Sequence, residues 1–229
     1  MAKKLFLGAL AVSALVAALH TAQAQSPQPG GQQPTMGQQP MGPAQMQAQK
    51  NLQNALTQAQ AIAPIFSNPV AWRGEVPAGV MGPNAPATTS QGTANCSPIL
   101  QGAWYTCEVN DKMGSGTNAS NWMGHMVVGY DATANSYKGV MIDNMGTGLE
   151  TLDGTLTGKK FTLTTTAPVM MMGQSQKQRL SFDYTDPNNI QFTDERQYAG
   201  QQGWVLNEKA TLKPYTSAAT RQASTPTRR

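Results

Sequence analysis

The chain has 229 residues and a formal net charge of +4 at pH 7, with only 2 cysteines and 2 histidines. Much of the positive charge lies at the two ends of the chain: Lys3, Lys4, Arg221, Arg228 and Arg229. The body of the chain has no clustered basic patch, which argues against nucleic-acid binding. The scarcity of histidine likewise excludes a multi-histidine zinc site and leaves no choice of partners for a Ser-His-Asp triad.

Residues 1–24 have the features of a secretory signal peptide. Lys3 and Lys4 precede an apolar run, and Ala22-Gln23-Ala24 matches the small-residue cleavage pattern. The apolar run is too short for a comfortable membrane span, and no second hydrophobic stretch follows it. We therefore expect cleavage after Ala24, a periplasmic or secreted protein, and no transmembrane segment in the mature chain.

The next segments change from a polar leader to a helix. Residues 25–50 are almost entirely Gln, Pro, Gly, Met and Ala, which bury too little apolar area to fold, so we expect a disordered leader. Apolar side chains such as Leu52 and Leu56 then recur at helical spacing until Pro64. This pattern predicts a short amphipathic helix over residues 51–66.

Residues 96–215 have the texture of a β-domain. Short β-branched and aromatic segments alternate with turns that contain Asp, Asn, Gly or Pro. Short turns join antiparallel neighbours, and about eight such strands can close into a barrel without exposed edges. The predicted strands are 101–109, 122–130, 136–144, 147–156, 160–167, 177–185, 189–198 and 203–213. The predicted fold class is all-β, an antiparallel up-and-down barrel of about eight strands, with a half-open sandwich as the alternative.

Two further segments flank this predicted barrel. Residues 67–95 are rich in Pro, Gly, Asn and Thr and are interpreted as an irregular connector. Residues 216–229 are polar and basic, and we expect a disordered tail.

The cysteine pair sits at the start of the predicted barrel. In an oxidising compartment we expect Cys96 and Cys107 to form a disulfide, the alternative being two free thiols. There is no C-x-x-C motif, so a thioredoxin-type redox role has no support.

The segment TLDGTLTGKKFTL at residues 151–163 resembles two phosphate-handling motifs but lacks a key residue of each. Thr151 stands where a haloacid-dehalogenase-type phosphatase needs its nucleophilic Asp. Only three residues separate Gly154 from Gly158, where a P-loop has four. We interpret the segment as a hairpin. Because no nucleophile–base set can be assembled elsewhere, we predict no enzymatic activity and no cofactor.

Met123, His125 and Met126 are weak candidates for a copper site, because thioethers suit Cu(I). In a regular strand Met123 and His125 point to one face and Met126 to the other, so only a bent strand gathers all three. The alternative is a histidine in the barrel wall and methionines that fill irregular space.

One face of the predicted seventh strand mixes apolar and charged residues: Ile190, Phe192, Asp194, Arg196 and Tyr198. If this face lines the lumen, Asp194 and Arg196 need each other or a ligand, and Asp143 and Glu208 could join them. The alternative is that a bulge or the open end of the barrel leaves these charges in water.

Two segments resemble a known family. GYDATANSYKGVMIDNMGTGLETLDGTL at residues 129–156 and LQGAWYTCEV at residues 100–109, with its L-x-G-x-W pattern, resemble a bacterial family of exported domains of unknown function. Members of that family are regarded as lipocalin-like. The resemblance covers about residues 98–213. It implies a calycin-type barrel and offers no activity to transfer.

The sequence therefore favours an exported, non-enzymatic binding protein whose barrel holds a small, partly apolar molecule. The alternative is a periplasmic copper-binding or envelope-stress protein that uses the methionine clusters and His125. The sequence specifies no oligomeric state. The candidate ligand-binding residues are Trp104, Trp122, Tyr130, Met141, Asp143, Phe182, Phe192, Asp194, Arg196 and Trp204.

Overall fold

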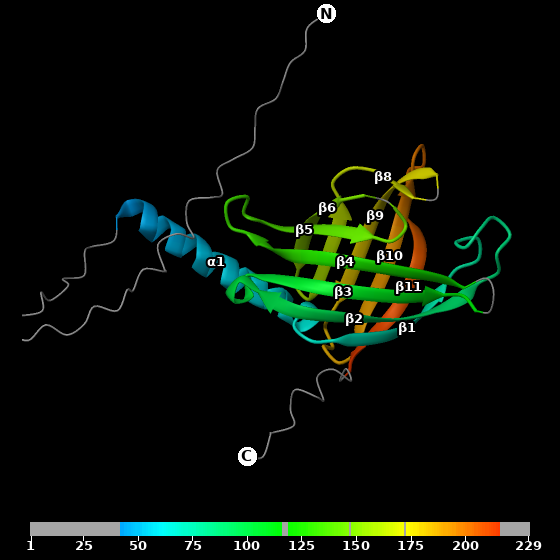
Figure 1. The fold of residues 1–229 in the computed structure, drawn as a ribbon, viewed down its shortest axis with the longest axis horizontal. Coiled ribbons are helices and arrows are strands. Elements are labelled where there is room, and N and C mark those ends of the chain that lie inside the picture. Colours follow the sequence, from blue (N-terminus) through cyan, green and yellow to red (C-terminus); the bar gives the residue numbers. More distant parts are fainter. Residues whose placement is uncertain (1–41, 116–118, 147, 172, 216–229) are drawn as a thin grey trace, which may run out of the picture. The chain divides into compact units, whose positions relative to one another are not determined.

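The computed structural model describes residues 42–115, 119–146, 148–171 and 173–215. The predicted signal peptide, most of the predicted leader and the predicted tail lie outside these residues. The described chain forms helix α1 (Pro43–Phe66), the short 3-10 helix η1 (Leu100–Gly102) and one antiparallel β-sheet that closes on itself (Figure 1).

The sheet is a barrel with one extra strand. Ten strands form the closed barrel, because β1 pairs with β11 and β9 pairs with β10, while β8 is added beside β9. The predicted all-β antiparallel barrel is thus confirmed, with two more strands than expected. The strands are β1 (Val70–Val76), β2 (Thr88–Ile99), β3 (Trp104–Met113), β4 (Ser120–Asp131), β5 (Ser136–Asp143), β6 (Glu150–Thr157), β7 (Lys160–Thr165), β8 (Val169–Met171), β9 (Gln174–Asp183), β10 (Ile190–Tyr198) and β11 (Val205–Pro214).

The expectation of an irregular connector over residues 67–95 is wrong. This segment contains β1 and most of β2, which form a hairpin paired from Val70 to Val76. Its Gly and polar residues have a role inside the barrel. The indole of Trp72 lies over Gly92, where a Cβ atom would come within 2.2 Å of the ring. Gly92 therefore permits a close approach that a side chain would prevent.

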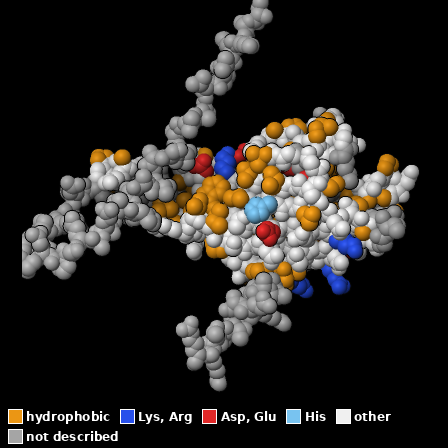
Figure 2. Space-filling model, in the orientation of Figure 1, with side chains coloured by type: hydrophobic (Ala, Val, Ile, Leu, Met, Phe, Trp, Pro, Cys, Tyr) orange, Lys and Arg blue, Asp and Glu red, His pale blue; other side chains and the backbone are white. Residues whose placement is uncertain are grey.

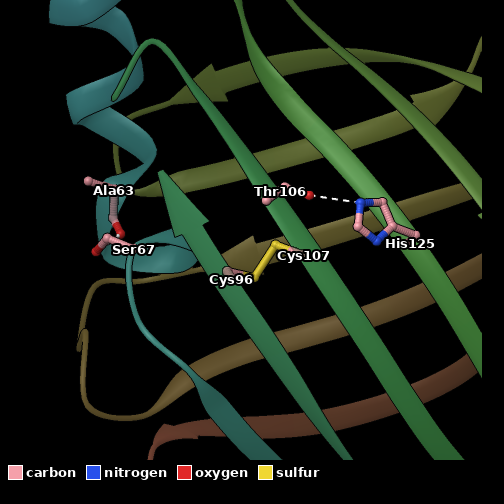
Figure 3. Close-up of a disulfide and its surroundings, with 6 residues drawn as sticks. All are labelled: Ala63, Ser67, Cys96, Thr106, Cys107 and His125. Carbon is pink, nitrogen blue, oxygen red and sulfur yellow. Dashed lines mark hydrogen bonds between the residues drawn. A yellow bond between two sulfur atoms is a disulfide. The ribbon is translucent and has the colours of Figure 1, made fainter. Parts of the chain in front are cut away.

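Helix α1 begins earlier than expected, at Pro43 rather than at residue 51. Proline suits the first helical position, and the Gly42 backbone N–H donates a hydrogen bond to Gln45 Oε1 (3.1 Å). The end at Phe66 agrees with the prediction. There the Ser67 side chain donates to the Ala63 carbonyl (2.6 Å; Figure 3).

The C-terminal half of α1 covers one end of the barrel, and the loop that connects β1 to β2 lies at the opposite end (Figure 1). Three tyrosine hydroxyls of the barrel wall donate hydrogen bonds to helix carbonyls. The bonds are Tyr105 to Ala59 (3.2 Å), Tyr137 to Gln58 (3.0 Å) and Tyr184 to Ala61 (2.8 Å). These bonds fix the helix to strands on different sides of the barrel.

Cys96 and Cys107 form the predicted disulfide, which lies between β2 and β3 (Figure 3). The two residues are directly opposite in the strand register, with 4.0 Å between their Cα atoms, and both are buried. The bridge therefore joins the strand that sequence reasoning missed to the first strand that it predicted.

Replacing both cysteines by serine should lower the free energy of unfolding by about 2–3 kcal/mol, because the bridge closes a short loop in the unfolded chain. Urea unfolding of the variant and of the oxidised protein measures the difference. The reduced wild-type protein is the control and should lose a similar amount. A loss under about 0.5 kcal/mol in both would contradict this account.

Candidate functional site: the barrel cavity

The barrel encloses a cavity of about 420 Å³, which is within the usual size range for small-molecule sites. Its floor is formed by Phe66, the last residue of α1. The half of the cavity nearest the helix is apolar. It is lined by Cys96, Cys107, Met126, Met141, Leu180, Phe182, Phe192 and Leu212.

A ring of buried polar side chains, here called the polar belt, lies farther from the helix. It contains Ser90, Asp111, Gln176, Gln178, Asp194, Arg196 and Glu208. These residues come from five strands. On each strand they continue the row of inward-facing residues beyond its apolar part, before the apolar residues on β2, β9 and β11 and after them on β3 and β10. All of them except Ser90 line the cavity.

Asp194 is the most heavily hydrogen-bonded member of the belt. It accepts hydrogen bonds from Gln178 Nε2 (3.1 Å), Arg196 Nη2 (2.8 Å) and Asn207 Nδ2 (2.8 Å). A β-bulge delivers the last of these, because the register shift after Asp194 turns Asn207 toward the cavity. Asp194 and Arg196 therefore face the lumen and pair with each other there.

Several buried polar atoms of the belt have no hydrogen-bond partner among the described residues. They are Asp111 Oδ1, Gln178 Oε1 and the Nε and Nη1 atoms of Arg196. The residues are only 6%, 4% and 7% exposed, respectively. Buried polar groups are normally hydrogen-bonded, so open acceptors and donors facing a cavity are typical of a site that binds a polar group.

The carboxyl group of Glu208 is held close to the inner wall of β1. It accepts a hydrogen bond from the Ser90 hydroxyl across Gly74, where a Cβ atom would lie 2.8 Å from Glu208 Oε1. Burial, and next the charge of Asp111, raise the pKa of Glu208 to about 7. Burial raises the pKa of Asp111 to about 6. The N–H group of the Trp72 side chain lowers this pKa and so offsets part of the shift.

The far end of the cavity, here called the methionine rim, carries Met81, Met113, Met145 and Met171. The neighbouring β1–β2 loop contributes Gly79 and Pro83. Methionine is unbranched and adapts its shape, so this rim suits the passage of apolar groups.

Most of the predicted pocket residues do line the cavity, and four do not. Trp122, Met141, Phe182, Phe192, Asp194 and Arg196 line it. Trp104, Tyr130, Asp143 and Trp204 are not among the lining residues.

The structure places these four residues elsewhere in the barrel. The inward-facing residues of β3 have odd numbers, so Trp104 points outward, and its ring lies over Gly129. Tyr130 is buried at the helix end, where its ring meets Tyr137. Asp143 accepts a hydrogen bond from Trp122 Nε1 (3.1 Å). Trp204 precedes β11, and its ring lies 4.4 Å from the Arg179 guanidinium.

Sequence reasoning missed Trp72, Ser90 and Asp111. The first two lie on β1 and β2, in the segment predicted to be an irregular connector, and Asp111 lies beyond the predicted end of the first strand at residue 109. The inward alternation of Val70, Trp72 and Gly74 is a signal that could have revealed β1.

The candidate copper ligands do not converge. Met123 is 52% exposed and His125 is also exposed, whereas Met126 is buried and lines the cavity. His125 instead bonds the Thr106 hydroxyl (2.8 Å; Figure 3), and its outer face of the barrel exposes several hydrophobic side chains (Figure 2). The copper alternative thus gains no support. The described residues also contain no group of three His, Cys, Asp or Glu side chains that could hold a metal ion.

The fold and the cavity define a closed antiparallel β-barrel with a partly polar interior. The chain belongs to the family described as protein of unknown function (DUF1579), which matches residues 71–211. The resemblance to a domain of unknown function is thereby confirmed, and the match begins in β1 rather than near residue 98. No curated protein matches the sequence. Among the described residues, no helix has the length and apolar character to cross a membrane.

Proposed function

We propose that this protein is a non-enzymatic binding protein, whose barrel holds a small molecule that is apolar over most of its length and polar at one end. The observation that carries the proposal is the cavity of about 420 Å³ with an apolar inner half and unpartnered polar atoms in its belt. An apolar ligand gains free energy from burial in the first half, and its polar end finds partners in the second.

The geometry also gives the ligand a direction. The C-terminal half of α1, which ends at Phe66, covers one end of the barrel, so the ligand enters past the methionine rim. Its apolar end leads and reaches Phe66, while its polar end stays at the belt.

The proposal includes export and a lipocalin-like mode of binding inside the barrel. The signal-peptide pattern of residues 1–24 supports export. The disulfide between Cys96 and Cys107 also supports it, because disulfides persist in oxidising compartments.

Binding of a neutral apolar fluorophore, N-phenyl-1-naphthylamine, tests the proposal. We expect its emission to rise on binding and Leu180→Trp, which fills the apolar half, to weaken binding by about tenfold or more. Val140→Trp is the matched control, because Val140 lies on β5 and is exposed.

Two results would count against the cavity as the site. One is no binding to the wild-type protein. The other is equal binding by both tryptophan variants, once circular dichroism has shown that both are folded.

A further inference from the structure

Resting on the proposed function, we infer that the polar end of the ligand is a cationic nitrogen. The cavity selects an apolar amine over the corresponding alcohol or carboxylate, with Asp111 and Glu208 receiving its N–H groups. The ligand class is thus an organic cation with an apolar body.

The balance of charge in the polar belt supports a cation. The belt contains three carboxyl groups but only one cationic side chain, Arg196. The Arg196 guanidinium is paired with Asp194 at 2.8 Å. No ion pair reaches Asp111 or Glu208 from the residues that the structure describes. A ligand ammonium group would supply the missing positive charge.

The open hydrogen-bond acceptors support the same class. Asp111 Oδ1 and Gln178 Oε1 are buried, line the cavity and lack a partner among the described residues. The amide oxygen of Gln178 and the ionised carboxylate of Asp111 can only accept hydrogen bonds. Asp194, by contrast, already accepts three hydrogen bonds, so it is not the receiving group. Trp72 lines the same cavity, and an indole ring attracts a cation that lies over its face.

The competing ligand is an anion held by Arg196, whose Nε and Nη1 atoms have no partner in the described part of the chain. The charge of Arg196 is balanced by Asp194, so an anion would add a further negative charge to a buried acidic belt. A neutral acceptor, such as an ether oxygen or a water molecule, satisfies these two N–H groups without that cost.

The ionisation of the belt gives a second expected behaviour. The titratable or charged groups that face the site are Asp111 on β3, Asp194, Arg196 and Tyr198 on β10, and Glu208 on β11. Burial holds the pKa of Asp111 at about 6 and that of Glu208 at about 7. Binding of an ammonium group favours the ionised carboxyls, so amine affinity should rise as the pH increases from about 5.5 to 8.

Isothermal titration with octylamine, 1-octanol and octanoate at pH 7.5 tests the inference. These probes share one apolar chain and differ in the charge of the polar end. We expect octylamine to bind at least about tenfold more tightly than the other two. Glu208→Gln and Asp111→Asn should each reduce this preference by about tenfold. Glu108→Gln is the control for both, because Glu108 is exposed on β3.

The other outcomes separate this inference from the proposed function. If octanoate binds most tightly, or all three probes bind equally, the inference is overturned but the cavity remains a binding site. If only N-phenyl-1-naphthylamine binds, the inference is again overturned and the cavity remains a binding site. If neither that fluorophore nor any octyl probe binds, the proposed function fails as well.

Discussion

Replacing Phe66 by alanine should lower the free energy of unfolding by about 3–5 kcal/mol, as is usual for the loss of a large buried aromatic side chain. Phe66 is 2% exposed. Its ring centroid lies 5.5 Å from that of Phe182, 5.9 Å from Phe161 and 6.1 Å from Tyr105. These contacts join α1 to the inner wall of the barrel, so their loss should loosen the helix as well as leave a void. Guanidinium unfolding followed by circular dichroism measures the change.

Two matched variants show whether the effect comes from the docked end of the helix. Leu52→Ala changes a residue of the same helix that is 43% exposed, and it should cost under about 0.5 kcal/mol. Phe66→Leu should fall between the two, because leucine retains part of the contact area. If Phe66→Ala were as mild as Leu52→Ala, α1 would not be packed against the barrel in solution.

The second large effect is a fall in stability as the pH rises from about 4.5 to about 7. The folded protein raises the pKa of Glu208 from its usual 4.5 to about 7, so over this range the folded state binds more protons than the unfolded state. The full stabilisation is therefore present at low pH and is lost as Glu208 ionises. For Glu208 alone the loss is roughly 3 kcal/mol, and Asp111 adds to it in the same direction.

Glu208→Gln removes one of the two titrating groups and keeps the shape of the side chain. We expect the decline between pH 4.5 and 7 to become roughly half as large in this variant. We also expect the variant to be more stable than the wild type at pH 8. Asp183 and Asp186, whose hydrogen bonds lower their pKa values, act below pH 4 and leave this window unchanged.

Urea unfolding at half-unit steps of pH measures both curves, with Glu108→Gln as the control that should follow the wild type. A wild-type stability that increases between pH 5 and 7 would contradict the burial of these two carboxyl groups.

Much of the barrel could be predicted from the sequence because its later strands follow simple rules. Leu180 and Phe182 of β9, and Tyr184 directly after it, alternate with residues on the outer face, and the turn that follows contains Asp186. The disulfide followed from the two cysteines, and the face relation between His125 and Met126 followed from strand geometry.

The first two strands were missed for a physical reason. Residues 88–98 read TTSQGTANCSP, which is polar and contains Gly and Pro, as many loops do. In the barrel Ser90 serves the polar belt, and Gly92 leaves space for Trp72. The polar and glycine residues that shape the cavity therefore make these strands difficult to predict from sequence, because an inward-facing polar residue breaks the usual apolar pattern.

Four predicted pocket residues lie outside the cavity lining, because residue type alone does not specify which face of a strand a residue occupies or where a strand ends. Trp104 is outward by parity, and Trp204 lies before the first residue of β11. Asp111 was missed because strand ends are hard to locate from sequence.

The pairing of β1 with β11 has a consequence for biogenesis. Val70 lies opposite Pro214, so the seam of the barrel joins residues separated by most of the described chain. A nascent polypeptide that has not yet released β11 from the ribosome has two unprotected sheet edges, at β1 and at β10. Such long-range pairing is slow, and incomplete chains with open edges are prone to aggregate. The other nine strands of the closed barrel therefore cannot reach their native arrangement until β11 has been synthesised.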